Sequence, residues 1–306
     1  MAGGASVEGV SQLEQPARLR VGVVGAGRVG AVLGAALARA GHRVVAVSAV
    51  SPASRERAAS LLPGAPVLAV PDVVAAAELV LLTVPDDELS PLVRGLTTTG
   101  AWVPGQLVVH TSGRHGLAVM RPARASVSPL ALHPAMTFEG SAVDLQRLAG
   151  CCFGVTAPPA LRLVGEALVV EMGGEPVWVL DADRPAYHAA LTHGANHLVT
   201  LVSQAMQVLR SAGVAAPDRV LAPLLSAALD GALRHGDAAL TGPVSRGDAG
   251  TVAAHVGELG DETADVLPTY VALARATAVR ALAAGRLSPQ ATARVLDALA
   301  PTKEPQ

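Results

Sequence analysis

The pattern of apolar and polar positions changes once along this chain, near Asp181. Before that point, short continuous apolar runs alternate with stretches whose apolar residues recur every three to four positions. Short runs of this kind are typical of buried parallel strands, and the recurring pattern is typical of amphipathic helices. The alternation predicts an α/β fold with a doubly wound, mainly parallel sheet. We expect strands at 20–24, 43–48, 66–69, 79–84, 106–110, 151–156 and 176–180, and helices at 28–40, from about Ser54, at 72–77, from 86 and at 159–172.

The part after Asp181 contains no convincing strand pattern and predicts an all-α domain. Ser288 and Pro289 are suited to the N-cap and first position of its last helix. Residues 1–17 lack the apolar core of a signal peptide, and we expect a disordered tail there. The predicted domains are therefore 18–181 and 182–301. Helices of the second domain are expected at 184–211, 217–235, 248–257, 262–284 and 289–299.

The first predicted strand leads directly into a glycine-rich loop that opens a helix. In this context Gly25 permits a tight turn, Gly27 permits close approach of the backbone to a pyrophosphate, and Gly30 permits close packing of helix on strand. The positive end of the helix dipole would face the phosphates. A structural turn that binds no phosphate is the alternative. The motif favours a Rossmann-like dinucleotide domain whose cofactor contacts are Gly25, Ala26, Gly27, Arg28, Val29 and Gly30.

The residues after the second predicted strand favour NADP over NAD. NAD-binding folds place an acidic residue there for the ribose hydroxyl, but no acid occurs between Gly30 and Arg55. Ser48, Ser51 and Arg55 offer hydroxyl and guanidinium donors that suit a 2′-phosphate. Solvated charges on a helix are the alternative interpretation of Arg55 and its neighbour Arg57.

Polar residues follow several predicted strands at the edge where ligands bind in such sheets. Val84, Pro85 and Ser112 are expected to contact the cofactor. His110 and His133 are candidate general acids, because imidazole titrates near neutral pH. Alternatively, His110 is a buried histidine that bonds to the backbone, and His133 is a turn residue before a proline.

The long predicted helix carries a second group of polar residues. His188, Thr192 and Asn196 follow each other at intervals of four, which places them along one face as a possible substrate wall. We expect His188 and Asn196 to take part in catalysis. His193 and His197 have the spacing of two metal ligands, but no acid accompanies them and we predict no metal site. The segment 240–248 is either a helix connection or, through Arg246, an anion site.

Composition excludes several classes of function. The net charge of −2 and the 2% aromatic content argue against nucleic acid and membrane surfaces as partners. The adjacent Cys151 and Cys152 are typical of reduced core residues in a cytoplasmic protein. Long apolar stretches at 189–209, 220–233 and 271–284 predict a homodimer through the helical domain.

The order of several short strings resembles a bacterial family that pairs a Rossmann-like oxidoreductase domain with a helical domain of unknown function. The strings are VPDDEL, VVHTSG, LHPAMTF, YHAALTHGANHL and LTGPVSRGD. More distantly, the layout is similar to the 6-phosphogluconate dehydrogenase-like enzymes, which include ketopantoate reductase, pyrroline-5-carboxylate reductase and the β-hydroxyacid dehydrogenases. This resemblance implies NADP-dependent reduction of a small carbonyl or imine substrate and a dimer.

The chain departs from those relatives in its proton donor. Ketopantoate reductases and β-hydroxyacid dehydrogenases use a lysine on the first interdomain helix, whereas Thr192 stands at that place here and the one lysine is Lys303. By elimination we expect His133, or otherwise His188, to donate the proton. Two other functions stay open: a non-catalytic NADP-binding sensor or scaffold, and a deazaflavin- or flavin-linked NADP reductase.

Overall fold

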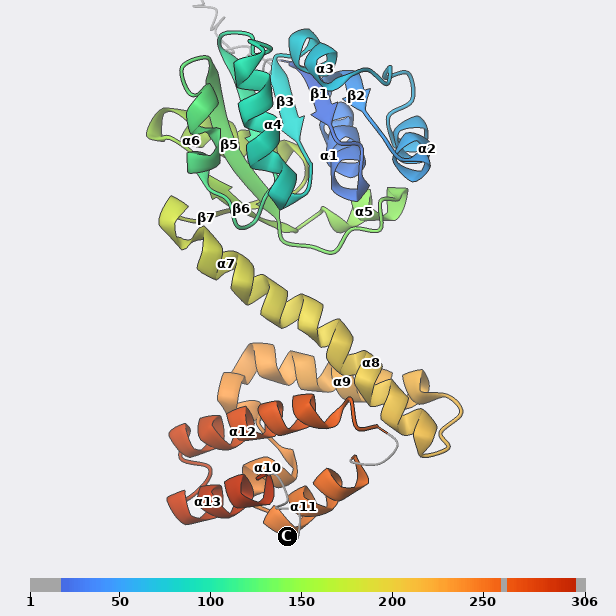
Figure 1. The fold of residues 1–306 in the computed structure, drawn as a ribbon, viewed down its shortest axis with the longest axis vertical. Coiled ribbons are helices and arrows are strands. Elements are labelled where there is room, and N and C mark those ends of the chain that lie inside the picture. The colour runs from blue at the N-terminus through green and yellow to red at the C-terminus, as the bar shows by residue number, and fades with distance from the viewer. Residues whose placement is uncertain (1–17, 260–262, 301–306) are drawn as a thin grey trace, which may run out of the picture. The chain divides into compact units, whose positions relative to one another are not determined.

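The computed structural model describes residues 18–259 and 263–300 of the chain. The chain divides into two compact units, Met1–Thr192 and His193–Gln306 (Figure 1). This division falls within the helical stretch expected at 184–211, eleven residues beyond the boundary predicted after residue 181. The expected disordered tail at 1–17 lies outside the described residues.

A seven-stranded sheet forms the centre of the first unit, in the order β2-β1-β3-β4-β5-β6-β7. All neighbouring strands are parallel except the β5–β6 pair, which is antiparallel. The predicted doubly wound, mainly parallel sheet is therefore confirmed. The strands are β1 (Arg20–Val24), β2 (Arg43–Ser48), β3 (Leu79–Leu82), β4 (Gln106–His110), β5 (Val127–Pro134), β6 (Cys152–Thr156) and β7 (Glu175–Trp178).

Helices cover both faces of this sheet and enclose two apolar cores (Figure 1). Successive strand residues supply opposite faces, so Val23 belongs to one core and Val24 to the other. On the first face α1 contacts α2, α5 and α6, and on the second α3 packs on β1 and β2. The α-helices of this unit are α1 (Arg28–Arg39), α2 (Pro52–Leu61), α3 (Val70–Ala76), α4 (Asp86–Thr98), α5 (Ala142–Arg147) and α6 (Arg162–Glu171), and α7 (Arg184–Leu191) leads away from the sheet (Figure 1).

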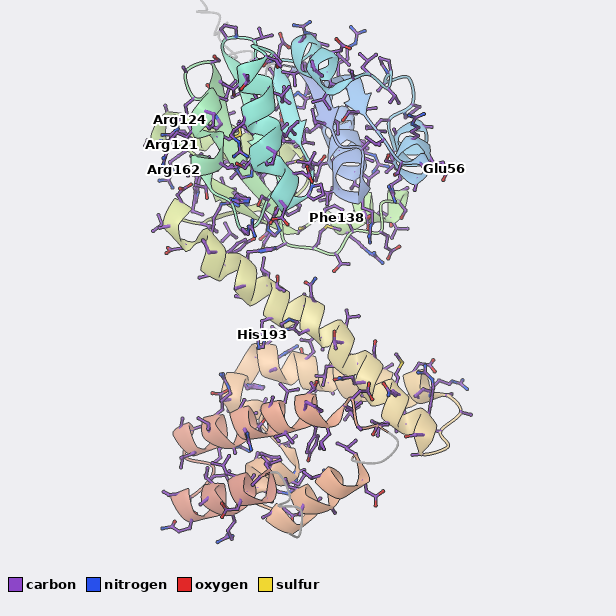
Figure 2. The ribbon with its side chains drawn as sticks, in the orientation of Figure 1. Glu56, Arg121, Arg124, Phe138, Arg162 and His193 are labelled. Carbon is purple, nitrogen blue, oxygen red and sulfur yellow. The ribbon has the colours of Figure 1, made fainter. Side chains whose placement is uncertain are left out.

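The sequence prediction of the strands was wrong at two places. The strand expected at 66–69 is only a single bridge between Val47 and Val67, and α3 follows at once. The strand β5 was not predicted, because Pro129 and Pro134 interrupt its apolar pattern and proline usually argues against an internal strand. His133 consequently lies near the end of a strand and not in a loop. The loop that follows carries Phe138, which is buried in the core on the α1 face (Figure 2).

The second unit is helical, as predicted, and its described residues contain no strand. A π-helical turn (Thr192–Asn196) precedes α8 (His197–Ser211), followed by α9 (Pro217–His235), α10 (Gly242–Arg246), α11 (Ala249–Glu258), α12 (Leu267–Ala283) and α13 (Pro289–Ala298). Ser288 caps α13 by accepting the backbone N–H of Ala291 at 3.2 Å. The first residues expected for α12, from 262, fall partly outside the described ranges.

Two further observations bear on the predictions from composition. No helix in the described part of the chain is long and apolar enough to cross a membrane. Both cysteines are free, but only Cys151 is buried. The assignment of Cys152 to the core was wrong, because its side chain is exposed at the start of β6.

Candidate active site

The turn between β1 and α1 is held in shape by Thr83, a residue that sequence reasoning missed. Gly25 has a φ of +95°, a conformation that L side chains rarely adopt. The Thr83 hydroxyl donates to the carbonyl oxygen of Gly25 at 2.6 Å. A Cβ on Gly30 would collide with both that carbonyl oxygen and the Thr83 hydroxyl. Gly25 and Gly30 are thus required by the turn itself, whether or not a ligand is bound.

Ser48, at the end of β2, supports the same turn from the other side. Its hydroxyl accepts the N–H of Gly25 at 2.9 Å, and its carbonyl oxygen accepts the N–H of Ala26 at 2.8 Å. The N–H of Gly27 bonds to the Gly25 carbonyl oxygen at 2.7 Å. Three residues predicted to bind cofactor therefore already form hydrogen bonds within the chain: Ser48 through its hydroxyl oxygen, and Ala26 and Gly27 through their backbone N–H groups.

The first turn of α1 presents three backbone N–H groups that have no acceptor among residues 18–259 and 263–300. They belong to Arg28, Val29 and Gly30. Such groups at a helix N-terminus form an anion site, because the N–H dipoles and the helix dipole both favour negative charge. A Cβ on Gly27 would meet no atom closer than 4.0 Å, so this glycine leaves open space in front of the turn. These features fit the pyrophosphate of a dinucleotide.

The predicted 2′-phosphate residues lie at the start of α2. Ser51 is its N-cap and accepts the N–H of Ser54 at 3.1 Å. Arg55 is exposed on the first turn of this helix. Both residues are exposed and could reach a cofactor, and their contact with it stays a prediction.

Two other arginines, Arg28 and Arg57, lie against Gly140 in the loop before α5. A Cβ on Gly140 would lie 2.8 Å from the Arg57 side chain and 2.9 Å from that of Arg28. The two guanidinium-bearing chains therefore lie against the same glycine, and neither has an ion-pair partner among the described residues. A solvated charge was the alternative interpretation of Arg57 in the sequence, and its half-buried position beside Arg28 fits a role in binding an anion better than that alternative does.

Val84, Pro85 and Ser112 lie where β3 and β4 end, as the topology required. Val84 is half-buried against the core on the α3 face, and Pro85 is exposed as the N-cap of α4. The buried Ser112 hydroxyl accepts the N–H of His115 at 3.0 Å. These contacts shape the loops, and a cofactor contact at each stays a prediction.

His133, Tyr187 and His188 form a cluster at the carboxyl end of β5. Nδ1 of His133 lies 3.1 Å from the Tyr187 hydroxyl, and the His133 and His188 ring centroids are 5.8 Å apart in an edge-to-face arrangement. Gly113, in the loop after β4, permits this packing. A Cβ there would lie 2.9 Å from Nε2 of His133 and 2.5 Å from Cδ2 of His188. The sequence singled out both histidines, and the structure brings them together.

A fully buried guanidinium lies beneath this cluster and was not predicted. Arg184, at the start of α7, donates to the Thr156 hydroxyl and to the carbonyl oxygens of Ser112, Ala131 and Gly154, at 2.8 to 2.9 Å. These four partners come from β5, β6 and the loop after β4. Arg184 therefore ties together the three segments on which the cluster rests.

Burial and positive charge keep His133 and His110 neutral near pH 7. Burial, with the neighbouring charges of His188 and Arg184, lowers the pKa of His133 to about 4, although Asp86 opposes the shift. Burial and the Arg184 charge lower the pKa of His110 to about 3. The pKa of Tyr187 is raised by burial, and Arg184 partly opposes that shift.

His110 and Asn196 differ from the cluster in their surroundings. The His110 side chain is fully buried, and its Nε2 lies 3.2 Å from the Gly116 carbonyl oxygen. This geometry matches the alternative of a histidine bonded to backbone. Asn196 is exposed at the end of the π-helical turn, in the second unit. Catalytic roles for these two residues stay predictions.

Comparison with known families agrees with this architecture. Residues 6–134 match the Rossmann-like domain family, and residues 151–277 match DUF2520, a domain of unknown function. The chain therefore pairs a Rossmann-like domain with a C-terminal DUF2520 domain, which confirms the resemblance noted in its sequence. No curated protein matches the chain.

Several solved structures share the fold. A candidate NADP oxidoreductase from Bacteroides fragilis is 21% identical, with a TM-score of 0.72 over 85% of this chain and 98% of that one. An imine reductase from Myxococcus stipitatus in complex with NADP+ is 19% identical, with a TM-score of 0.62 over 90% and 99% of the two chains. A reductive aminase from Aspergillus terreus in complex with NADPH and ethyl levulinate is 18% identical, with a TM-score of 0.61 over 91% and 99%. At these identities the likeness shows the fold alone.

Proposed function

We propose that this protein is an NADP-dependent oxidoreductase that reduces a small carbonyl or imine compound. One observation carries the proposal: the open N–H groups of the glycine turn and the His133–Tyr187–His188 cluster lie at the same edge of one sheet. The turn follows β1, and the cluster lies two strands beyond the neighbouring β3. A dinucleotide extended along this edge would have its phosphates at α1 and its nicotinamide toward β4 and β5.

The residues around the turn fit the cofactor. Arg28, Val29 and Gly30 would bind the pyrophosphate through their N–H groups. Ser51 and Arg55, with Arg57 as a further candidate, would bind the 2′-phosphate through charge-assisted hydrogen bonds. When bound, NADPH supplies a hydride to the carbon of a C=O or C=N group.

The chain itself must provide the proton that the substrate oxygen or nitrogen takes up. A His133 with a pKa of about 4 carries no imidazolium proton at pH 7. We therefore assign the donor role to the Tyr187 hydroxyl, with His133 as its hydrogen-bond partner and His188 as the adjacent polar wall. Burial raises the pKa of Tyr187, and the Arg184 charge offsets part of that rise and so reduces the cost of the tyrosinate left after proton transfer. His133, the donor expected from sequence, becomes the residue that orients the Tyr187 hydroxyl through this hydrogen bond, and a proton from solvent water restores the hydroxyl after each turnover.

The similar structures support the choice of substrate class. The proteins from Myxococcus stipitatus and Aspergillus terreus are an imine reductase and a reductive aminase, and the latter was solved with a keto ester. Cyclic imines and 2-keto acids are thus the first compounds to screen. Deazaflavin belongs in the same screen, because it distinguishes an electron-transfer role.

Tyr187→Phe tests the proposal directly once the NADPH absorbance screen identifies a substrate. The substitution removes the hydroxyl and keeps the ring, so turnover should fall by about 10²–10⁴-fold, the usual contribution of a general acid. NADPH affinity should stay nearly unchanged, because the hydroxyl is remote from the glycine turn.

Tyr270→Phe is the matched control. Tyr270 also bonds to a histidine, with its hydroxyl 2.9 Å from Nδ1 of His255, but both residues belong to the second unit. Normal turnover in Tyr187→Phe, or an equal loss in both variants, would contradict the role assigned to Tyr187.

A further inference from the structure

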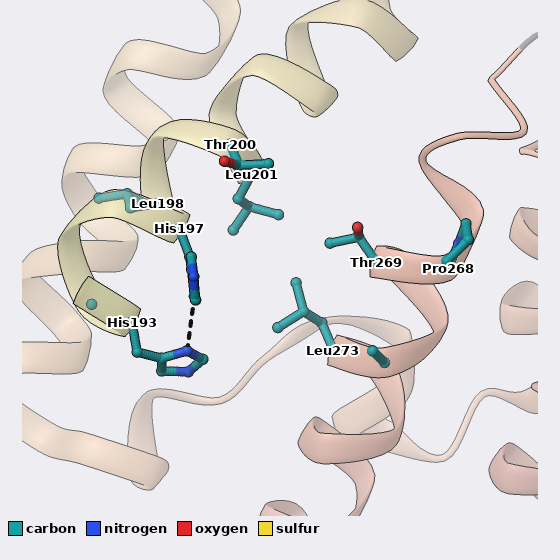
Figure 3. A pocket seen from close by; sticks show the side chains of 10 residues that line it. His193, His197, Leu198, Thr200, Leu201, Pro268, Thr269 and Leu273 are labelled. Atoms are coloured by element: carbon teal, nitrogen blue, oxygen red, sulfur yellow. Dashed lines mark hydrogen bonds between the residues drawn. The ribbon is translucent and has the colours of Figure 1, made fainter. Parts of the chain in front are cut away.

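A pair of histidines in the second unit is not used by the proposed reaction. His193 and His197 are both exposed, and their Nδ1 atoms lie 3.1 Å apart. The two rings meet edge to face, with centroids 5.3 Å apart and an interplanar angle of 88° (Figure 3). The same two residues had the spacing of metal ligands in the sequence, where the lack of an accompanying acid led us to predict no metal site.

The local backbone sets this pair apart from an ordinary helical pair. Residues Thr192–Asn196 form a π-helical turn, so His193 lies on the π turn and His197 is the first residue of α8. Single π turns inside α-helices are rare and are often found at functional sites. Here the turn determines how the His193 ring is presented to the His197 ring.

The pair opens into a cavity of about 660 Å³ within the second unit. The opposite wall comes from α12 and includes Thr269 and Leu273 (Figure 3). Within the part of the chain that the structure describes, no acidic or basic side chain other than the two imidazoles lines this cavity. Its walls are otherwise mostly apolar, so the two ring nitrogens are its strongest potential ligands.

The separation of the nitrogens matches the geometry of a shared cation. Zinc–nitrogen bonds of about 2.0–2.1 Å place two ligands of a tetrahedral site about 3.3–3.4 Å apart. The observed 3.1 Å lies within a few tenths of an ångström of that value. A neutral imidazole that binds through Nδ1 keeps its proton on Nε2, so both rings can bind without a net loss of protons.

We propose that His193 and His197 bind a divalent cation of the zinc class. Among the described residues no third His, Cys, Asp or Glu joins them to make a group of three. Two coordination positions therefore face the cavity and are free for water or for a small oxygen or nitrogen ligand. Structural zinc sites have four protein ligands and catalytic ones three, so a site with two protein ligands would hold its cation exchangeably.

Calorimetry of the untagged full chain with zinc chloride tests this site. We expect one zinc ion per chain, and a loss of affinity of at least tenfold in both His193→Gln and His197→Gln. Two controls should bind as the wild type does: His235→Gln, which removes an exposed histidine on α9, and Cys152→Ser, which removes the exposed thiol. Circular dichroism of each variant shows whether the helices are retained.

Titration with cobalt(II) provides a second measurement. The wild type should give the visible absorption of tetrahedral cobalt, and the two histidine variants should not. The proposal is overturned if zinc binds the histidine variants as tightly as the wild type, if Cys152→Ser abolishes binding, or if the wild type binds no zinc. In those cases the pair is only a hydrogen bond between two imidazoles.

Discussion

Single residues determine the electrostatics of the candidate site. Arg184 is fully buried, and its hydrogen-bond acceptors are carbonyl and hydroxyl oxygens rather than carboxylates. Burial lowers its own pKa to about 10, and it stays charged at neutral pH. Its charge, added to burial, keeps His110 and His133 neutral. The site is therefore suited to a neutral hydrogen-bond relay more than to an imidazolium acid.

The low histidine pKa values predict a loss of stability in acid. The pKa values are about 3 for His110 and about 4 for His133, against about 6.5 when unfolded. Below pH 6.5 the unfolded chain binds protons that the folded chain does not. The free energy of unfolding should therefore fall with falling pH, down to the folded pKa values. The slope approaches about 1.4 kcal/mol per pH unit for each histidine.

Urea unfolding between about pH 7 and pH 5 measures this slope. Trp102 and Trp178 are the two tryptophans of the chain and both lie in the first unit, so fluorescence follows that unit. His110→Gln keeps a donor for the Gly116 carbonyl oxygen but cannot titrate, and should give a shallower slope. An identical slope in the variant would show that His110 is not held neutral.

Residues of the site could be predicted from sequence where one local rule placed them. The three glycines follow from the backbone of a strand–turn–helix, and His133 and His188 from polar residues near strand ends and on the long helix. Arg184 and Thr83 could not be predicted in this way. Their partners come from segments distant in the sequence, such as Ser112 and Gly154 for Arg184, and no local pattern records those contacts.

At the scale of elements, the glycine turn contains one glycine that the fold requires, Gly30, and one that only ligand binding would require, Gly27. Gly30→Ala should destabilise the first unit, because its Cβ collides with the Gly25 carbonyl oxygen and the Thr83 hydroxyl. We expect a loss of about 1–3 kcal/mol, visible in thermal unfolding by tryptophan fluorescence. Gly27→Ala meets no such atom and should unfold as the wild type does.

Cofactor binding by the same two variants completes this comparison. Gly27→Ala should lose NADPH affinity while it keeps its stability, because its methyl group occupies the space in front of the turn. If Gly27→Ala binds NADPH normally, the pyrophosphate does not approach this glycine. If Gly30→Ala is as stable as the wild type, the packing described for the turn is wrong.

Most elements were predictable because hydrophobic periodicity is a local property. The strand β5 is the instructive exception. Its prolines and its polar positions at Ser128 and His133 hide the apolar run, and pairing with β4 and β6 on both sides determines its conformation. The sequence predicted a mainly parallel, doubly wound sheet but not the order of its strands, because pairing between distant strands leaves no local signal in one sequence.

At the scale of the whole molecule, the second unit of the single chain has many exposed apolar side chains. No residue of α8 is buried in the single chain, although the helix is rich in leucine and valine. Leu224 and Leu233 on α9 are 63% and 80% exposed. Contiguous apolar surface of this kind usually marks an interface. We therefore expect a twofold homodimer through the second unit.

Light scattering at micromolar concentration tests this expectation. The wild type should have twice the mass of the chain, and Leu224→Asp should shift it toward the monomer. Leu163→Asp is the control, because Leu163 is 80% exposed on α6 in the first unit and should leave the dimer intact. A monomeric wild type would contradict the prediction.

The central claim is that the first unit binds NADP, and calorimetry with NADPH and NADH tests it most directly. NADPH should bind more tightly than NADH. Arg55→Ala should weaken NADPH binding by about 1.5–3 kcal/mol, the cost of losing a charge-assisted contact, with little effect on NADH. Arg39→Ala, at the opposite end of α1, should change neither affinity. Equal affinities in the wild type would contradict the NADP assignment, and binding of neither nucleotide would contradict the account as a whole.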